Sequence, residues 1–217
     1  MKPAIITIDG PAGTGKSTVS RLVALALELP HLDTGAFYRA ATVACLRHQV
    51  DPGDSQAVVD LVESLSFDQV GDRMYLDGED ITGAIRLPEV TNTVSIVSAH
   101  AGVRNALVEQ QRRWVESREQ RAVVEGRDIG SIVFPDAGLK LYLDAAPEVR
   151  ARRRAGETGQ DVARVLEDQE RRDIFDSTRT VSPLTVPTGA VVIDTTDLSI
   201  DEVVARIVEL AGQPSSG

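Results

Sequence analysis

A glycine-rich stretch near the start of the chain carries residue types that bind phosphate. Gly10–Ser17 read GPAGTGKS, directly after the apolar run Ala4–Asp9 and at the opening of a helical pattern. Glycines let several backbone N–H groups point inward around an anion, and the helix that follows adds its positive end. Lys16 can bridge the β and γ phosphates of a nucleoside triphosphate, and the Ser17 hydroxyl can bind Mg²⁺. The stretch therefore predicts a phosphate-binding loop.

This loop supplies the residues that we expect to hold the phosphates of a nucleoside triphosphate, with Mg²⁺ as the cofactor and Ser17 as its protein ligand. They are Gly10, Pro11, Ala12, Gly13, Thr14, Gly15, Lys16, Ser17 and Thr18. A glycine-rich turn without a ligand is the alternative. Because switches, motors and kinases share such loops, the loop alone does not define the reaction.

Two of these classes lack their other features in the sequence. A guanine-dependent switch needs an Asn/Thr-Lys-x-Asp segment, and neither Lys2 nor Lys140 has those neighbours. A motor works on a polymer or a partner ring, whereas this chain is small and acidic, with a net charge of −10. Two possibilities remain: a kinase that acts on a small molecule, and a protein that binds a nucleotide as a sensor without phosphorylating a small molecule.

Three further segments bring charged side chains to places where a second ligand would bind. They are Leu32–Arg39 (LDTGAFYR), Glu125–Gly130 (EGRDIG) and Arg171–Leu184 (RRDIFDSTRTVSPL). The first two follow expected strands, and ligands of open parallel sheets bind beyond the carboxyl ends of the strands. We therefore expect an acceptor site here.

Together with the phosphate loop, these segments resemble those of bacterial cytidylate kinases. The resemblance covers nearly the whole chain, including an extra lobe at Asp51–Pro88. It implies the reaction ATP + CMP ⇌ ADP + CDP, with dCMP also accepted and Mg²⁺ required. The other candidate within the enzyme class is a P-loop kinase for a different monophosphate or metabolite.

The resemblance also assigns the residues that bind the acceptor. It places Thr34, Tyr38 and Arg39 at the CMP phosphate and sugar, Ser95, Arg104 and Asp128 near the cytosine ring, Arg127 close to the phosphate, and Arg172, Asp176 and Arg179 around the sugar and phosphate. The family usually has serine where this chain has Thr34, and threonine keeps the hydroxyl.

The chemistry of these residue types agrees with the assignment. Cytosine presents an amino donor where uracil presents a carbonyl, so the Asp128 carboxylate accepts from one base and repels the other. Such contacts discriminate by about 1–3 kcal/mol each, so Asp128 with Ser95 and Arg104 would favour CMP over UMP by roughly tenfold to several hundredfold. The alternatives are that Asp128 forms an ordinary salt bridge with Arg127 and that Tyr38 belongs to the core.

A run of arginines precedes two glycines in the last third of the chain. Arg150, Arg152, Arg153 and Arg154 come before Gly156 and Gly159. A solvated helix face is the alternative, but phosphoryl transfer gains from arginines that arrive when a flap closes. The resemblance implies a lid at about residues 150–160, and the expected catalytic residues are Lys16, Arg127, Arg150 and Arg154.

The patterns predict an α/β chain with a three-layer P-loop NTPase fold, a parallel sheet flanked by helices. Expected strands are 4–9, 31–33, 122–125, 139–143 and 191–193; expected helices are 16–28, 36–47, about 92–117, near 147–155, 161–176 and 199–210. We expect a single kinase domain over 1–217. A small α+β monophosphate-binding lobe, at about 34–100 with small strands in the insert 51–88, and the short lid complete it.

The bulk composition limits the partners. The net charge of −10 argues against a nucleic-acid polymer, and no apolar run approaches the roughly 18 residues needed to cross a bilayer. Cys45 is the only cysteine, and the strand pattern begins at Ala4, which leaves no space for a leader. We expect a cytoplasmic monomer whose partners are CMP, dCMP and ATP.

Overall fold

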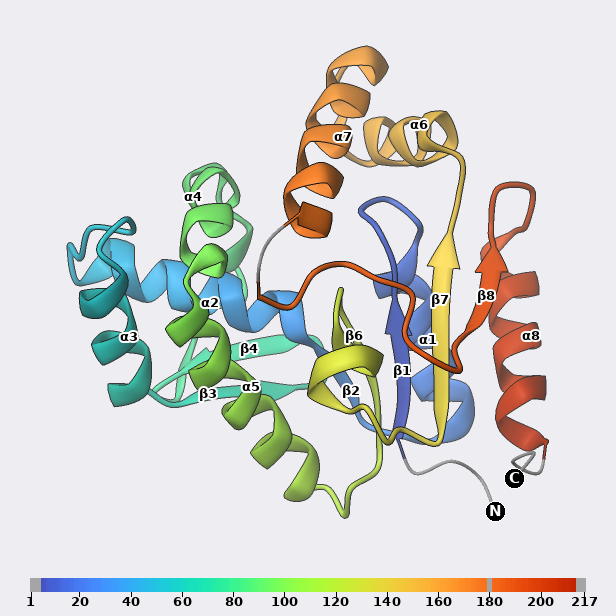
Figure 1. Cartoon of the computed structure of the whole chain (residues 1–217), viewed down its shortest axis with the longest axis horizontal. Helices are drawn as coiled ribbons and strands as arrows, with labels where there is room; N and C mark the ends of the chain where they lie inside the picture. The colour runs from blue at the N-terminus through green and yellow to red at the C-terminus, as the bar shows by residue number, and fades with distance from the viewer. Residues whose placement is uncertain (1–4, 179–180, 214–217) are drawn as a thin grey trace. The chain divides into compact units, whose positions relative to one another are not determined.

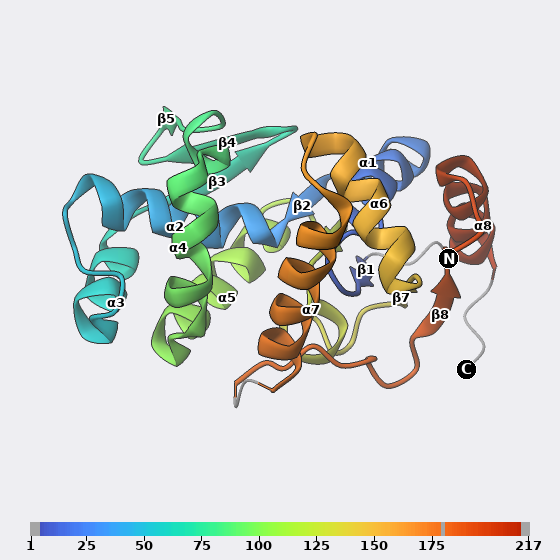
Figure 2. The same ribbon diagram turned by 90° about the horizontal axis from the view of Figure 1, so that it is seen from above.

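Alternating apolar strands and amphipathic helices build the part of the chain that carries the phosphate loop. The computed structural model describes residues 5–178 and 181–213, so the expected acceptor residue Arg179 lies outside the described residues. The described chain forms two compact units: unit 1 holds the residues up to His31 and from Gln120 onward, and unit 2 holds Leu32–Glu119. Figures 1 and 2 show the elements of each unit in two views.

Unit 1 contains the main strands. Its elements are β1 (Ile5–Asp9), α1 (Lys16–Leu27), β6 (Ala122–Glu125), the π-helical turn η2 (Ile129–Val133), β7 (Leu139–Asp144), α6 (Pro147–Thr158), α7 (Val162–Thr178), β8 (Val191–Asp194) and α8 (Ile200–Gly212). The sheet has the order β2-β6-β1-β7-β8, and the edge strand β2 (His31–Asp33) crosses the boundary between the units. Strand β1 pairs in parallel with β6 and β7, and β7 with β8.

Side-chain alternation along β1 separates the core from the site. Ile6 and Ile8 are fully buried in an apolar cluster to which α1 and α8 contribute Val23 and Ile207. Because successive side chains of a strand point to opposite faces, Thr7 and Asp9 lie on the other face of β1. That face meets the turn η2. The core therefore fixes the strand, and the strand aims Asp9 towards the segment that follows β6.

Unit 2 is built from helices and a small antiparallel sheet. Its elements are α2 (Thr34–Arg47), α3 (Ser55–Ser64), β3 (Phe67–Val70), β4 (Arg73–Leu76), β5 (Glu79–Asp80), the 3₁₀ turn η1 (Ala84–Arg86), α4 (Pro88–Ala99) and α5 (Ala101–Glu116). The three strands pair in the order β3-β4-β5. Helix α5 covers the open edge of β3, where the indole N–H of Trp114 donates to the carbonyl of Gln69 at 3.0 Å.

The expected helix over about 92–117 was wrong in one respect, because two helices occupy this region. The chain turns at His100, whose backbone is extended (φ −71°, ψ 120°). The His100 ring Nε2 lies 2.8 Å from the carbonyl oxygen of Pro52, and a Cβ on Gly102 would lie 2.6 Å from Val59 of α3. Close packing of α5 on α3 thus sets a bend that helical periodicity alone does not reveal.

Two other boundaries differ from expectation. The insert contains helix α3 as well as the expected strands, and its start is capped by Asp54, whose carboxylate accepts from the Ala57 N–H. Helix α6 continues through Gly156 and ends only at Gly159, which adopts φ +70°. Ala155 of α6 packs against Val165 of α7, and this contact supports the last turn of α6. The predicted parallel sheet flanked by helices is confirmed.

The length and apolar character of the helices bear on whether one of them could cross a membrane. Across residues 5–178 and 181–213, no helix is both long and apolar enough to span a bilayer.

Candidate active site

The phosphate loop joins β1 to α1 through glycines in conformations that other residues rarely adopt. Gly10, Gly13 and Gly15 have φ values of +145°, +80° and +86°. A Cβ on Gly10 would lie only 2.1 Å from the carbonyl oxygen of Leu143 in the neighbouring strand β7. The loop therefore needs glycine both for its backbone turn and for its close approach to the sheet.

Lys16 is the buried cation of this loop. It is 7% exposed, and its Nζ donates to the carbonyl oxygen of Pro11 at 2.6 Å and to Thr14 Oγ1 at 3.4 Å. Burial holds the pKa of Lys16 well below its usual value, and the positive charge of Arg127 adds to this effect. Bound phosphate would supply the negative charge that favours the protonated ammonium.

Ser17 begins a short polar chain at the start of α1. Its hydroxyl donates to Glu125 Oε2 at 2.9 Å, and Glu125 Oε1 lies 3.4 Å from Nε2 of His31. The same ring nitrogen lies 2.9 Å from Ser20 Oγ. A hydroxyl and a carboxylate side by side are the oxygen donors that suit Mg²⁺, directly or through bound water. The donor set therefore fits the cation expected from the sequence.

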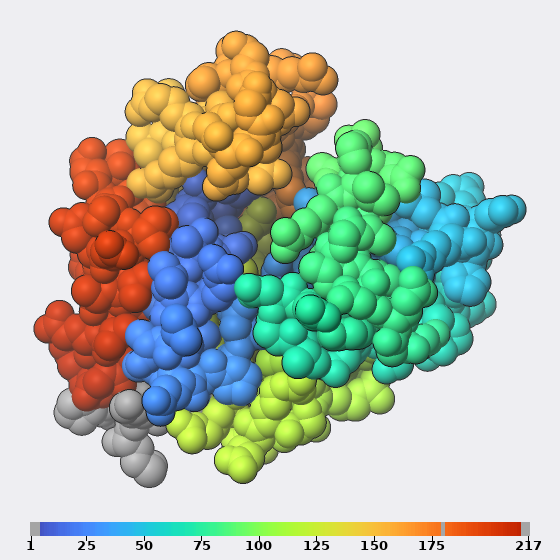
Figure 3. Space-filling model, turned by 180° about the vertical axis from the view of Figure 1, so that it is seen from behind, coloured from blue at the N-terminus to red at the C-terminus, as the bar shows by residue number. Residues whose placement is uncertain are grey.

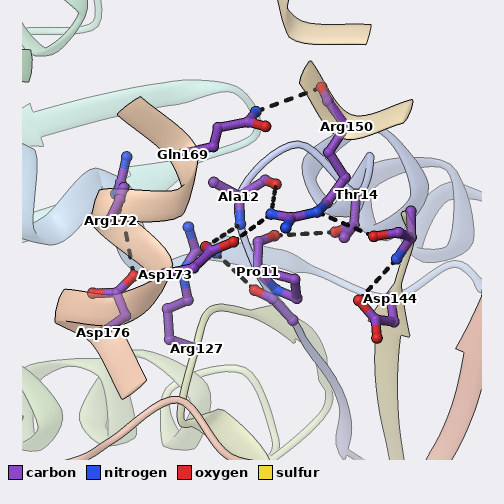
Figure 4. Close-up of polar contacts among 12 residues, drawn as sticks. Pro11, Ala12, Thr14, Arg127, Asp144, Arg150, Gln169, Arg172, Asp173 and Asp176 are labelled. Atoms are coloured by element: carbon purple, nitrogen blue, oxygen red, sulfur yellow. Dashed lines mark hydrogen bonds and ion pairs between the residues drawn. The ribbon is translucent and has the colours of Figure 1, made fainter. Parts of the chain in front are cut away.

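Arg127 connects the acceptor segment to the phosphate loop within unit 1. Its Nη1 donates to the carbonyl oxygen of Gly10 at 2.9 Å, and its Nε donates to Asp176 Oδ2 at 3.0 Å. Arg172 Nε lies 4.0 Å from the same Asp176 oxygen (Figure 4). The carboxylate that Arg127 contacts thus belongs to Asp176 of α7. Three of the expected acceptor residues are brought together here.

The start of α6 and the middle of α7 contact the phosphate loop directly. Arg150, 6% exposed, donates from Nη1 to the carbonyl oxygen of Ala12 at 2.9 Å and also pairs with Asp173. The Ala12 N–H donates to Asp173 Oδ1 at 3.3 Å (Figure 4). In Figure 3 the orange atoms of α6 and α7 lie over the dark blue atoms of the first part of the chain. A carboxylate therefore contacts an amide that the sequence assigns to phosphate.

The other arginines of α6 have different surroundings. Arg153 donates from Nη2 to the carbonyl oxygen of Thr195 at 2.6 Å and from Nη1 to the Thr195 hydroxyl at 3.1 Å. Arg154 is exposed and pairs with Glu157 one turn along the same helix at 2.9 Å. Of the two α6 arginines expected to be catalytic, Arg150 contacts the phosphate loop, whereas the contacts of Arg154 are within α6.

Unit 2 carries five of the other expected acceptor residues. The guanidinium of Arg104, 2% exposed, lies over the ring of Tyr38 at 5.1 Å from the ring centroid. Arg39 donates to the carbonyl oxygen of Ile85 at 3.1 Å and to the hydroxyl of Thr91 at 2.9 Å. Two of the expected acceptor residues, Tyr38 and Arg104, are thus in contact within unit 2.

Two more of these residues lie on separate helices of unit 2. Thr34 is the buried first residue of α2, which is capped by the Asp33 carboxylate. Ser95 lies half-buried on α4, and its carbonyl oxygen accepts from the Ser98 hydroxyl. In unit 1, Asp128 is 4% exposed and directly precedes η2.

Sequence reasoning did not identify Asp9 and Asp173 as part of the site. Asp9 is fully buried, and its two carboxylate oxygens accept from the N–H groups of Ile129 and Gly130. The available signal was a charged residue that ends an otherwise apolar strand just before the loop. Asp173 had a weaker signal, as the neighbour of Arg172 in the third charged segment.

The strand, glycine loop and helix, with a buried lysine at the start of the helix, define a P-loop kinase fold. The chain is similar in fold to a gluconokinase from Sinorhizobium meliloti 1021, with a TM-score of 0.50 and 16% identity over 97% of this chain and 96% of that chain. The family model described as Cytidylate kinase matches residues 6–213. The chain belongs to the cytidylate kinase family.

Two bacterial relatives have similar sequences over nearly their full lengths. The chain is 47% identical to the cytidylate kinase of Mycobacterium leprae (strain Br4923), covering 99% of this chain and 98% of that protein. It is 48% identical to the cytidylate kinase of Rhodococcus jostii (strain RHA1), covering 94% and 93% of the two chains. Both likenesses span the two units described above.

Proposed function

We propose that this protein is an ATP-dependent kinase that transfers the γ-phosphoryl group of ATP to CMP, and also to dCMP, giving ADP and CDP or dCDP. Membership of the cytidylate kinase family is the observation that carries this proposal. The buried Lys16 in its glycine loop, with Arg127 bonded to the carbonyl oxygen of Gly10, supports it.

An assay of ADP release tests the proposal across CMP, dCMP, UMP, AMP and GMP. Activity led by CMP and dCMP is the expected result. A different best acceptor would replace the proposal by another monophosphate kinase, and no release with any acceptor would favour a nucleotide sensor.

Positioning and charge neutralisation account for the catalysis in this proposal. The attacking group is already an anionic phosphate oxygen, so no hydroxyl needs to lose a proton. The N–H groups of the phosphate loop and the ammonium of Lys16 hold the ATP phosphates. Arg127 neutralises negative charge where the phosphates of the donor and the acceptor meet. Ser17 and Glu125 would hold Mg²⁺, which would supply further positive charge at the ATP phosphates.

CMP recognition is assigned to residues of each unit. In unit 2 these are Thr34, Tyr38, Arg39, Ser95 and Arg104. In unit 1 they are Arg127, Asp128, Arg172 and Asp176. Arg179, which lies outside the described residues, is assigned from the sequence alone. We infer that unit 2 contains the monophosphate-binding lobe. We also propose that the protein works in the cytoplasm as a monomer.

Asp128 gives the first prediction. If its buried carboxylate accepts from the cytosine amino group, Asp128→Asn introduces an amide whose N–H₂ also suits the uracil carbonyl. The ratio of kcat/KM for CMP over UMP should fall by about tenfold or more, in line with the roughly 1–3 kcal/mol of one base contact. Steady-state kinetics with both acceptors measures this ratio. An unchanged ratio would assign Asp128 a structural role.

Arg150 is proposed to reach the transferring phosphates, and its pairing with Asp173 gives a second prediction. The carboxylate of Asp173 contacts both the Ala12 N–H and Arg150. A triphosphate that needs the same two groups must displace it, and its negative charge opposes the phosphates. Asp173→Asn should therefore lower the KM for ATP, by about threefold to tenfold if like-charge repulsion of roughly 1 kcal/mol is relieved.

The KM for ATP at saturating CMP measures this effect. Asp168→Asn is the matched control, because Asp168 lies on the same helix and is exposed beside Arg171. A higher KM for ATP in Asp173→Asn than in the control would contradict the displacement and indicate that Asp173 only holds Arg150 in place.

A further inference from the structure

Asp9 is a buried carboxylate to which the mechanism above assigns no role. It ends β1, it is fully buried, and it directly precedes Gly10 of the phosphate loop. Its Oδ1 accepts from the Ile129 N–H at 2.7 Å and its Oδ2 from the Gly130 N–H at 2.8 Å. Both oxygens of one side chain are thus bonded to two consecutive amides of the turn η2.

These bonds form part of a larger connection between two loops of unit 1. The Gly126 N–H donates to the carbonyl oxygen of Ile8 at 3.1 Å, and Arg127 Nη1 donates to that of Gly10 at 2.9 Å. The loop that carries Arg127 and Asp128 is therefore bonded to three consecutive residues at the end of β1. Of these three residues, only Asp9 uses its side chain.

The turn η2 has little freedom to move away from Asp9. It is a π-helical turn, a rare conformation that is frequent at functional sites, and it begins directly after Asp128. A Cβ on Gly130 would lie 2.8 Å from Thr7 Oγ1 and 3.2 Å from Asp9 Oδ2. A side chain at position 130 would therefore displace Thr7 and press on Asp9.

Stability alone does not explain a carboxylate at this position. Burial raises the pKa of Asp9 to about 6, the charge of Asp128 adds to the rise, and the two N–H bonds and Lys16 oppose it. Tyr142, which pairs with Asp9 in the register of β1 and β7, is a further ionisable group near it. The pKa of Asp9 in the fold exceeds its ordinary value of 3.8. The contribution of Asp9 to folding stability is therefore greatest below pH 3.8 and is lost as the pH rises through about 6. The ionised form is kept despite its cost in stability.

We propose that Asp9 is a positioning residue that fixes the Arg127–Gly130 loop against the phosphate loop and so sets how tightly the acceptor is bound and how well its base is distinguished. The inference rests on the proposed function, since Arg127 and Asp128 are the residues through which Asp9 acts. It adds a residue of the donor side to the machinery that binds the acceptor.

Asp9→Asn is the direct test, because an amide of the same shape keeps one acceptor oxygen and turns an N–H₂ donor towards the other backbone N–H. The KM for CMP at pH 8 should rise by about tenfold and the CMP/UMP ratio should fall, while the KM for ATP changes by less than about twofold, since only one charge-assisted bond to the acceptor loop is lost. Asp144→Asn is the matched control at the end of the neighbouring strand β7, where the carboxylate accepts from the N–H of the next residue, Ala145.

The pH dependence separates positioning from general destabilisation. The phosphate of CMP itself titrates near pH 6, so the informative quantity is the ratio of the KM for CMP in Asp9→Asn to that in the unaltered protein, from which the substrate cancels. This ratio should be about ten at pH 8 and approach one at pH 5, because protonation removes the charge of Asp9 in the unaltered protein. The denaturation midpoint of Asp9→Asn should equal or exceed that of the unaltered protein at pH 8.

Gly130→Ala provides a second variant that leaves every charge in place. Its added methyl group presses on Asp9 and Thr7, and the KM for CMP should rise in the same way. An unchanged KM for CMP and CMP/UMP ratio in both variants, or a KM ratio that stays constant between pH 5 and 8, would overturn the inference. If the unaltered protein prefers CMP in the same assays, the proposed function stands even when the inference about Asp9 fails. If the unaltered protein has no activity with CMP, both the proposed function and the inference fail.

Discussion

Lys16→Met is expected to reduce kcat about a thousandfold while the protein remains folded. The ammonium of Lys16 is the buried cation at the start of α1, and removal of one preorganised donor to a reacting phosphate typically costs about a hundredfold to a thousandfold. Stability should not decrease. Because burial lowers the pKa of Lys16, the fold disfavours its charge, and methionine fills a similar volume without one.

Turnover with saturating ATP and CMP, together with the denaturation midpoint, measures both effects. Lys140→Met is the control. Lys140 is a partly exposed lysine of β7, and its Nζ donates to the Thr188 carbonyl oxygen at 3.3 Å. Near-normal turnover of Lys16→Met would show that this lysine does not act on the transferred phosphate.

Arg127→Gln is expected to lower kcat/KM for CMP by about a hundredfold to a thousandfold, the range for loss of one preorganised charge contact in a reacting site. Arg127 contacts both the phosphate loop and Asp176 of α7, so its loss removes positive charge where the two phosphates would meet. It also leaves the Asp176 carboxylate, 6% exposed, without this partner. A loss of stability of roughly 1–3 kcal/mol should therefore accompany the loss of activity.

A double variant separates these two consequences. Arg127→Gln with Asp176→Asn removes the buried charge and should recover the denaturation midpoint without recovering turnover of CMP. Arg171→Gln is the control for α7, because Arg171 is exposed and pairs with the acidic neighbours Glu167 and Asp168 on that helix. If the double variant recovers activity together with stability, Arg127 serves the fold and not the transfer.

Local patterns were sufficient for the elements that the core dictates. Ile5–Asp9 and Ala122–Glu125 are apolar runs of strand length, and burial in a parallel sheet is the arrangement that covers such runs. The phosphate loop was equally predictable from the sequence. Its glycines are needed for positive φ and Lys16 for a cation next to phosphate, and both requirements are local. The ends of helices were harder to predict. The bend at His100 depends on contacts with Pro52 and Val59, which no window around residue 100 contains.

The sequence by itself determined the parallel α/β fold, the phosphate loop and, through its resemblance to a family, the chemistry of donor and acceptor. Only the tertiary structure decided which charges act on one another. It paired Arg127 with Asp176, brought Arg150 and Asp173 to Ala12, and bonded Asp9 to the amides of Ile129 and Gly130. The physical reason is that such contacts join residues from 49 to 161 positions apart, and their energies depend on burial and distance, which residue spacing does not encode.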